Sequence, residues 1–197
     1  MEYTTLGRTS LKVSVAGLGC GGPSRLGLKD KSKTESDVVA HVRYAIDLGI
    51  NFFDTAEWYG TEAVVGKGIA GVARDRLVLS TKKNIVPEDH PDPEKEIRRS
   101  LEQSLKTLGT DYVDVYHVHG AEPKDYRNAK ERHLPTMLRL REEGKIRTVG
   151  ITERFVVDSS HTMLEQALRD NVWDVIMVGF NLLNPCARKN IFPLTAA

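Results

Sequence analysis

Short apolar runs alternate with longer amphipathic stretches along most of the chain. Strands buried on both faces of a sheet are short and continuously apolar, whereas a surface helix repeats its apolar residues at intervals of three and four. The apolar runs predict strands at residues 15–19, 51–54, 76–81, 112–118, 146–151 and 173–180. The amphipathic stretches predict a helix from 34–37 to a stop at Gly49, and helices at 62–72, 91–108, 134–143 and 162–169.

A strand followed by a helix thus recurs about six times, with no linker between the units. This order is typical of an α/β protein with a parallel sheet and right-handed crossovers. Two further short runs, 3–6 and 11–14, flank a turn-like break and predict an antiparallel hairpin ahead of the first unit. A chain of 197 residues fits one domain. The periodicity leaves undecided whether the sheet is open or closed into a barrel.

Composition and charge narrow the classes of partner. The chain has 28 Lys and Arg against 27 Asp and Glu, a formal net charge of +1. We therefore expect no nucleic-acid partner and no attraction to an anionic membrane. No apolar run approaches the roughly 18 residues of a membrane span. The two cysteines, Cys20 and Cys186, form no ligand or redox motif, which suits the reducing cytosol and predicts a cytoplasmic protein.

Four side chains that can carry or share protons fall where predicted strands end. Asp54 closes the strand 51–54, and Tyr59 lies on the loop after it. Lys82 follows the next strand, and His119 follows the one after that. The carboxyl ends of parallel strands lie at one edge of the sheet, where α/β proteins build their active sites. The sequence therefore predicts that these four side chains converge.

Such a cluster has a specific chemistry. A lysine ammonium beside a phenol favours the phenolate, so we expect Lys82 to lower the pKa of Tyr59 from its ordinary value near 10. A carboxylate partner, Asp54, would keep Lys82 charged, and His119 could orient or share the proton. The cluster predicts that Tyr59 is a general acid for a carbonyl oxygen whose carbon receives a hydride from elsewhere.

Two other motifs have competing interpretations. Residues 17–22, Gly-Leu-Gly-Cys-Gly-Gly, match the GxGxxG pattern of dinucleotide-binding turns, but that turn needs a helix to open at once and here Pro23 and a polar loop follow. We expect instead that these glycines let the backbone approach a bound group. His117 and His119 have the same strand parity, but no third ligand stands at suitable spacing, so we predict no metal site.

Segments spread over almost the whole chain resemble those of the aldo-keto reductase family. They are LGRTSLKVS, GLGCGG, NFFDTAEWYG, LSTKK, LGTDYVDVYHVH, REEGKIRTVGI and FNLLNP, in the family's order. The resemblance implies a (β/α)8 barrel of the TIM type with an N-terminal β-hairpin, and use of NADPH or NADH without a Rossmann domain. It also implies that Asp54, Tyr59, Lys82 and His119 are the catalytic residues. Tyr59 would protonate the carbonyl oxygen of a small aldehyde or ketone, or the reaction would run in reverse on an alcohol.

The resemblance further implies where the cofactor binds. The positions are Cys20, Gly21, Asp54, Thr152, Glu153 and Met177. Thr152-Glu153 replaces the usual Ser-Asn; the threonine hydroxyl can substitute for serine, but an ionised glutamate cannot donate a hydrogen bond. Met177 replaces a glutamine and has no donor. The intact catalytic set favours an NAD(P)H-dependent reductase, whereas these replacements leave open a non-catalytic scaffold that binds a nucleotide as a regulatory or interaction module.

The length of the chain suggests a further expectation. A barrel of this kind takes roughly 250 residues, so we expect the domain, residues 1–197, to be C-terminally incomplete, with only about six βα units. Strands 15–19 and 173–180 would then be open edges with unpaired backbone groups. We expect that residues 1–197 alone do not form a stable, cofactor-binding monomer. Either the natural chain continues past Ala197, or a partner or a second copy covers the edges.

Overall fold

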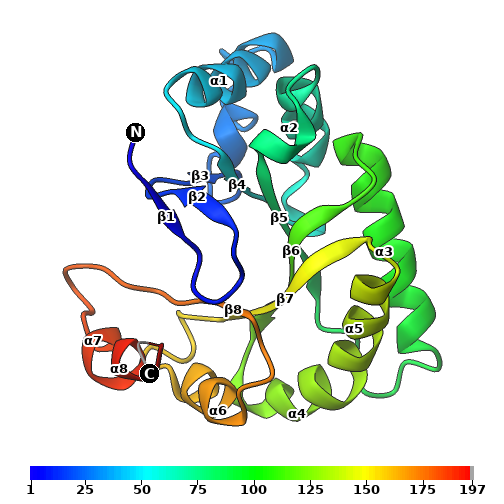
Figure 1. Ribbon diagram of the computed structural model, residues 1–197, viewed down its shortest axis with the longest axis vertical. Coiled ribbons are helices and arrows are strands. Elements are labelled where there is room, and N and C mark those ends of the chain that lie inside the picture. Colours follow the sequence, from blue (N-terminus) through cyan, green and yellow to red (C-terminus); the bar gives the residue numbers. More distant parts are fainter. Residues whose placement is uncertain (196–197) are drawn as a thin grey trace.

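A computed structural model describes residues 1–195 of the protein. Its centre is a six-stranded sheet in which every strand runs parallel to its neighbours and the strand order follows the chain. The strands are β3 (Leu18–Gly19), β4 (Phe52–Asp54), β5 (Val78–Asn84), β6 (Val113–Ala121), β7 (Ile146–Glu153) and β8 (Val175–Met177). The sheet curls into part of a barrel (Figure 1). The prediction of a parallel α/β fold of the TIM type, with about six units present, is confirmed.

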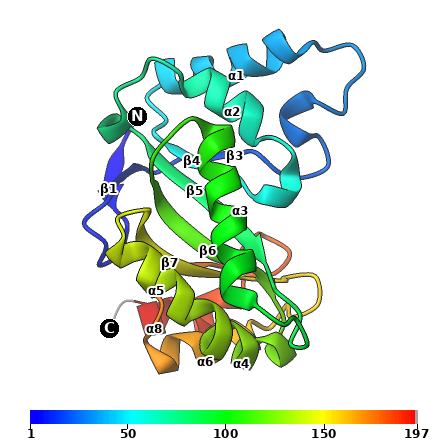
Figure 2. The same cartoon turned by 90° about the vertical axis from the view of Figure 1, so that its right-hand side faces the viewer.

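Helices cover the convex face of the sheet (Figure 2). The long ones are α1 (Glu35–Asp47), α2 (Glu62–Ile69), α3 (Pro93–Leu108), α5 (Leu134–Glu142) and α6 (Thr162–Asp170), each within a few residues of its prediction. Short helices are α4 (Tyr126–Asn128), α7 (Ala187–Asn190) and α8 (Phe192–Thr195). Local chemistry sets several ends: Thr34 and Asp37 form a capping box at α1, and Gly109 ends α3 with a φ of 69°. None of the helices described in residues 1–195 has the length and apolarity needed to cross a membrane.

The predicted N-terminal hairpin is present and fills the concave side of the sheet. Its strands are β1 (Tyr3–Thr5) and β2 (Lys12–Ser14). Leu11 and Val13 pack there against Val78, Val115 and Val175, which point inward from β5, β6 and β8. The residues that follow two of these valines, Leu79 and Tyr116, lie in the larger core between the sheet and the helices. Successive residues of a strand face opposite sides of the sheet. The hairpin therefore closes one end of the curled sheet.

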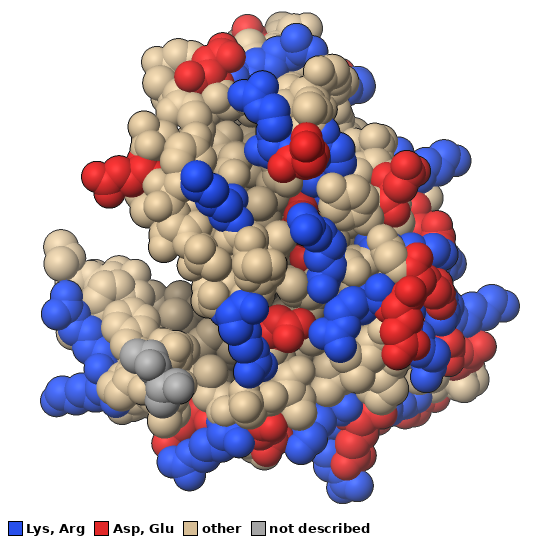
Figure 3. Space-filling model, viewed as in Figure 1, with Lys and Arg blue, Asp and Glu red and all other residues tan. Residues whose placement is uncertain are grey.

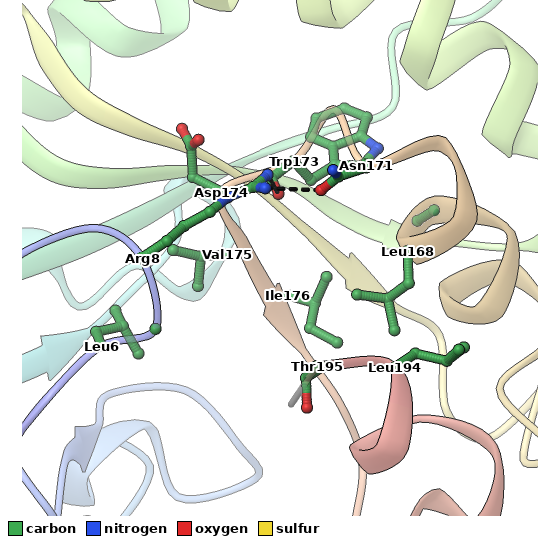
Figure 4. A pocket seen from close by; sticks show the side chains of 12 residues that line it. Leu6, Arg8, Leu168, Asn171, Trp173, Asp174, Val175, Ile176, Leu194 and Thr195 are labelled. Atoms are coloured by element: carbon green, nitrogen blue, oxygen red, sulfur yellow. Dashed lines mark hydrogen bonds between the residues drawn. The ribbon is translucent and has the colours of Figure 1, made fainter. Parts of the chain in front are cut away.

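The two outermost strands are shorter than predicted. β3 has two residues and β8 has three, although 15–19 and 173–180 were expected as strands. Each has a hydrogen-bonded neighbour on one side only, so fewer of its backbone groups are held in the ladder. At the amino end of β8, Arg8 in the hairpin turn reaches across and donates to Asn171 Oδ1 at 2.6 Å and to the Trp173 carbonyl at 2.8 Å. A cavity of about 550 Å³ lies beside this bridge, between the hairpin turn, α6, β8 and α8 (Figure 4).

A buried histidine in the fold predicts acid sensitivity. His133 is fully buried, and its Nε2 accepts a hydrogen bond from the Val86 N–H at 2.9 Å, which requires a neutral ring. Burial lowers the pKa of His133 to about 4, against about 6.5 for an unfolded chain. Between these values the unfolded state binds the extra proton, so stability is complete above about pH 6.5 and is lost as the pH falls, by at most about 1.4 kcal/mol per pH unit.

We therefore expect His133→Gln, whose amide oxygen can accept the same hydrogen bond, to flatten the fall in unfolding free energy between pH 7 and pH 5. Urea unfolding at both values measures this. His41→Gln, the same substitution at an exposed position, provides the control for the change of side chain itself. A His133→Gln protein that loses stability as steeply as the wild type would show that this ring does not contribute to the acid sensitivity.

Candidate active site

The structure brings all four predicted catalytic side chains to the carboxyl end of the sheet. Asp54 is the last residue of β4, and Lys82 and His119 lie near the ends of β5 and β6. Tyr59 ends a 3₁₀ turn, Glu57–Tyr59, which is followed by Gly60 in the left-handed region at φ 70°. The parallel register aligns the strand ends, which is why residues far apart in the sequence meet here.

An ion pair forms the base of this cluster. Lys82 Nζ lies 2.6 Å from Asp54 Oδ2 and also donates to the Thr55 carbonyl at 2.7 Å. The Ser80 hydroxyl donates to the other Asp54 oxygen at 2.8 Å. The Lys82 side chain is 1% exposed and that of Asp54 is 20% exposed. Burial lowers the pKa of Lys82, and the nearby Asp54 carboxylate opposes that shift.

Tyr59 and His119 form the outer part of the cluster. The Tyr59 hydroxyl lies 3.4 Å from His119 Nε2, and the two rings meet edge to face at 5.4 Å. Lys82 Nζ lies 4.9 Å from the centre of the Tyr59 ring. Burial first, and the Lys82 charge second, lower the pKa of His119 to about 4. His119 is therefore a neutral imidazole at pH 7.

The prediction that Lys82 lowers the pKa of Tyr59 is wrong. The pKa of Tyr59 is raised to about 12, chiefly by burial and then by the negative charge of Asp54. The physical reason is that the Lys82 ammonium is already neutralised by the Asp54 carboxylate in direct contact with it. At neutral pH Tyr59 is thus a protonated phenol, which is the form that can donate a proton.

Lys83 and His117, which lie close in the sequence to Lys82 and His119, do not belong to this cluster. Lys83 points away from Tyr59 and pairs with Glu57 at 2.9 Å and Glu96 at 3.3 Å. His117 is buried below the cluster, against Gly150, where a Cβ on the glycine would lie 2.2 Å from its Nδ1. Within residues 1–195 no three His, Cys, Asp or Glu side chains are placed to hold a metal ion.

Cys20 and Gly21 lie directly behind Tyr59. The Cys20 N–H donates to the Asp54 carbonyl at 2.8 Å, which continues the pairing of β3 with β4. A Cβ on Gly21 would lie 2.6 Å from the Tyr59 ring, so only a glycine lets the ring occupy this place. The glycine run therefore does permit a close approach, and the group that approaches is Tyr59. Contact of Cys20 and Gly21 with a cofactor stays a prediction.

The three positions implied on β7 and β8 differ in what they offer a ligand. Thr152 Oγ1 accepts the Gly120 N–H at 2.7 Å, which leaves its own hydroxyl hydrogen free to donate. Met177 is half-buried and has no donor. Glu153 accepts the Gly179 N–H at 2.6 Å and lies 2.9 Å from His161 Nδ1, and burial raises the pKa of its carboxyl. The carboxylate is therefore already bound within the protein.

His161 was not among the residues predicted from the sequence. It lies in the left-handed region at φ 66°, is fully buried with Glu153, and stacks on Phe155 with ring centres 5.7 Å apart. No local pattern marks this contact, because it depends on how the loop after β7 folds back over the end of that strand.

Comparisons with known proteins agree with this fold. The chain matches the family model described as "Aldo/keto reductase family" over residues 18–197. It is 38% identical to L-galactose dehydrogenase of Arabidopsis thaliana over 157 residues, 77% of this chain and 48% of that protein. It is 36% identical to aldo-keto reductase YhdN of Bacillus subtilis (strain 168) over 164 residues, 77% of this chain and 47% of that one. The chain thus spans about half the length of these relatives.

Solved structures give the same result. The aldo/keto reductase from Klebsiella pneumoniae in complex with NADP and acetate superposes with a TM-score of 0.76, at 28% identity, over 98% of this chain and 64% of that chain. The thermostable aldo-keto reductase Tm1743, in complex with the inhibitor epalrestat, superposes with a TM-score of 0.65, at 32% identity, over 83% of this chain and 58% of that chain.

Proposed function

Because this chain belongs to the aldo/keto reductase family, we propose that it uses NADP(H), or NAD(H), to reduce an aldehyde or ketone to an alcohol, or catalyses the reverse oxidation. The observation that carries the proposal is the contact of Tyr59 with His119 directly above the Lys82–Asp54 pair. These groups come from separate strands and from one loop. A reductase needs a proton donor at such a position, and the geometry supports Tyr59 in that role.

The side chains have distinct roles in this proposal. The Tyr59 phenol donates its proton to the carbonyl oxygen, and the bound nicotinamide supplies the hydride to the carbonyl carbon. Neutral His119 hydrogen-bonds the same hydroxyl and orients it. The buried ion pair of Lys82 and Asp54 fixes the Lys82 ammonium 4.9 Å from the centre of the Tyr59 ring and forms the base of the site beneath the proton donor.

The donor set around the site suits a nicotinamide in part. Thr152 has a hydroxyl hydrogen free to bind a carboxamide oxygen, while the Glu153 carboxylate is occupied by His161 and Gly179. Aldo-keto reductases from Klebsiella pneumoniae were crystallised with NADP in one case and with NADPH in another, which supports NADP(H) as the cofactor.

Cofactor binding is the first experiment. Trp58, 68% exposed and adjacent to Tyr59, should report a bound nicotinamide through quenched fluorescence. We expect saturable quenching by NADPH, and a weaker or equal effect with NADH. Consumption of NADPH with a set of small aldehydes then tests turnover. Absence of both binding and turnover would contradict the proposal.

A non-catalytic, nucleotide-binding scaffold is the second candidate. The occupied Glu153 carboxylate and the lack of a donor at Met177 favour it, because both remove contacts that a carboxamide would use. Saturable NADPH binding without turnover of any aldehyde, ketone or alcohol would support this candidate over the enzyme.

The charge distribution supports a small-molecule partner rather than nucleic acid. Positive and negative side chains are interspersed over the face seen in Figure 3, in keeping with the net charge of +1. No field of one sign therefore attracts nucleic acid to this face.

Self-association through the sheet edges is a further prediction. β3 and β8 end the sheet on its two sides, and Phe180, Leu182 and Leu183 are exposed just after β8. Open strand edges and contiguous apolar side chains favour pairing with another chain. We expect sedimentation velocity to show concentration-dependent dimers or larger species. A single monomeric species that melts cooperatively at all concentrations would contradict this prediction.

A further inference from the structure

The loop between β3 and α1 places a cation beside the proposed active site. The Arg25 guanidinium carbon lies 5.1 Å from the centre of the Tyr59 ring and 5.1 Å from that of the Trp58 ring. Arg25 is half-buried, whereas the Trp58 side chain is mostly exposed. A guanidinium thus lies over the proposed proton donor and next to an exposed indole.

The charge of Arg25 has no protein counter-ion among the described residues. Most arginines of residues 1–195 pair with a carboxylate, as Arg74 does with Asp114 at 2.7 Å. Within residues 1–195, Arg25 forms no ion pair and its guanidinium donates no hydrogen bond. Its guanidinium lies instead over the rings of Trp58 and Tyr59. The other charges near Tyr59 are already matched, because Lys82 pairs with Asp54 and Glu57 pairs with Lys83. Within the described residues, Arg25 is thus an uncompensated charge beside Tyr59.

The backbone holds Arg25 in this place. Arg25 and the next residue, Leu26, both have left-handed backbones, with φ of 50° and 59°. Residues other than glycine adopt this region at an energetic cost and keep it when surrounding contacts impose it. Here Leu26 packs against the main core, so the loop has an anchored side chain and projects the preceding arginine toward Tyr59.

We propose that Arg25 binds an anionic group of the substrate, and that the preferred substrate is an aldehyde or ketone that carries a carboxylate. This inference rests on the proposed function and extends it to a substrate class. A guanidinium presents parallel N–H donors that match the two oxygens of a carboxylate, and such a charged pair is stronger than a neutral hydrogen bond. The exposed Trp58 ring offers a flat surface for the part of the substrate between its carbonyl and its anion.

Two aldehydes of nearly equal shape test the proposal. The carboxylate of 4-carboxybenzaldehyde is replaced by a neutral amide in 4-formylbenzamide. With saturating NADPH, we expect the wild type to favour the anion in kcat/KM. Arg25→Met should reduce the ratio of the two kcat/KM values by about 10- to 100-fold, the scale of a hydrogen bond to a charged group. Arg25→Lys, which keeps the charge but loses the two parallel N–H donors, should give an intermediate ratio. Arg76→Met is the matched control, because Arg76 is exposed before β5, at the opposite end of the strands; both kcat/KM values should be unchanged.

Binding is measured separately from turnover. The non-reducible 4-methylbenzoate and 4-methylbenzamide should differ in Kd for the wild type and not for Arg25→Met, with a difference that shrinks at high salt. This arm decides the proposal even if the protein reduces no aldehyde, in which case the proposed function fails alone. The Kd of NADPH, measured for the wild type and for Arg25→Met, shows whether Arg25 binds an anion of the substrate or a phosphate of the cofactor. We expect the two Kd values to be equal. A ratio unaffected by Arg25→Met, or a loss confined to NADPH binding, would overturn the proposal.

Discussion

Tyr59→Phe is expected to lower kcat by about 10²- to 10⁴-fold, the usual contribution of a general acid. The change removes one oxygen from a ring packed against Gly21, His119 and Lys82, so the ring and the cofactor site should keep their geometry. The pKa of Tyr59, about 12, means that the wild-type donor is fully protonated at neutral pH. The loss should therefore appear in kcat at every pH near neutrality, and the Kd for NADPH should not change.

The control is a tyrosine far from the site. Tyr44 lies on α1 with 62% of its surface exposed, so Tyr44→Phe should have wild-type kcat. Steady-state NADPH consumption and fluorescence titration supply the two measurements. If Tyr59→Phe retains more than about a tenth of the wild-type rate, another group donates the proton and the assignment of Tyr59 is incorrect.

Asp54→Asn is expected to destabilise the fold by about 3 kcal/mol. It would leave the Lys82 ammonium, 1% exposed, without its counter-ion, and removing one partner of a buried ion pair typically costs about 3–5 kcal/mol. The lower end of this range applies because the Asp54 side chain is 20% exposed and water partly screens the pair. Adding Lys82→Met should restore much of the stability, since an apolar side chain then replaces the unpaired charge.

A double-mutant cycle in urea measures this coupling. Arg127 and Glu131 provide the surface comparison, because their side chains are 82% and 58% exposed and such pairs contribute about 0.2–1 kcal/mol. We expect the Asp54–Lys82 coupling to exceed that of the surface pair several-fold. Additive effects of the two substitutions would show that the ion pair does not hold the site together.

The repeated βα units and the place of the site were accessible from the sequence. Strands and helices differ in the period of their apolar residues, which is a local property of the chain. Asp54, Tyr59, Lys82 and His119 each follow or end a predicted strand, and parallel strands align their carboxyl ends. Strand order and direction were therefore sufficient to predict that these residues meet.

Tertiary structure alone decided the curl of the sheet and the state of the groups within it. The pKa of Tyr59 is raised although Lys82 is near. Burial and the Asp54 carboxylate raise it, and the Lys82 ammonium does not oppose them because it is paired with Asp54. The Glu153–His161 pair and the position of Arg25 over two aromatic rings depend likewise on how loops fold back over strand ends. Burial and electrostatic energy are sums over neighbours that are distant in the sequence, so no local pattern of residues contains them.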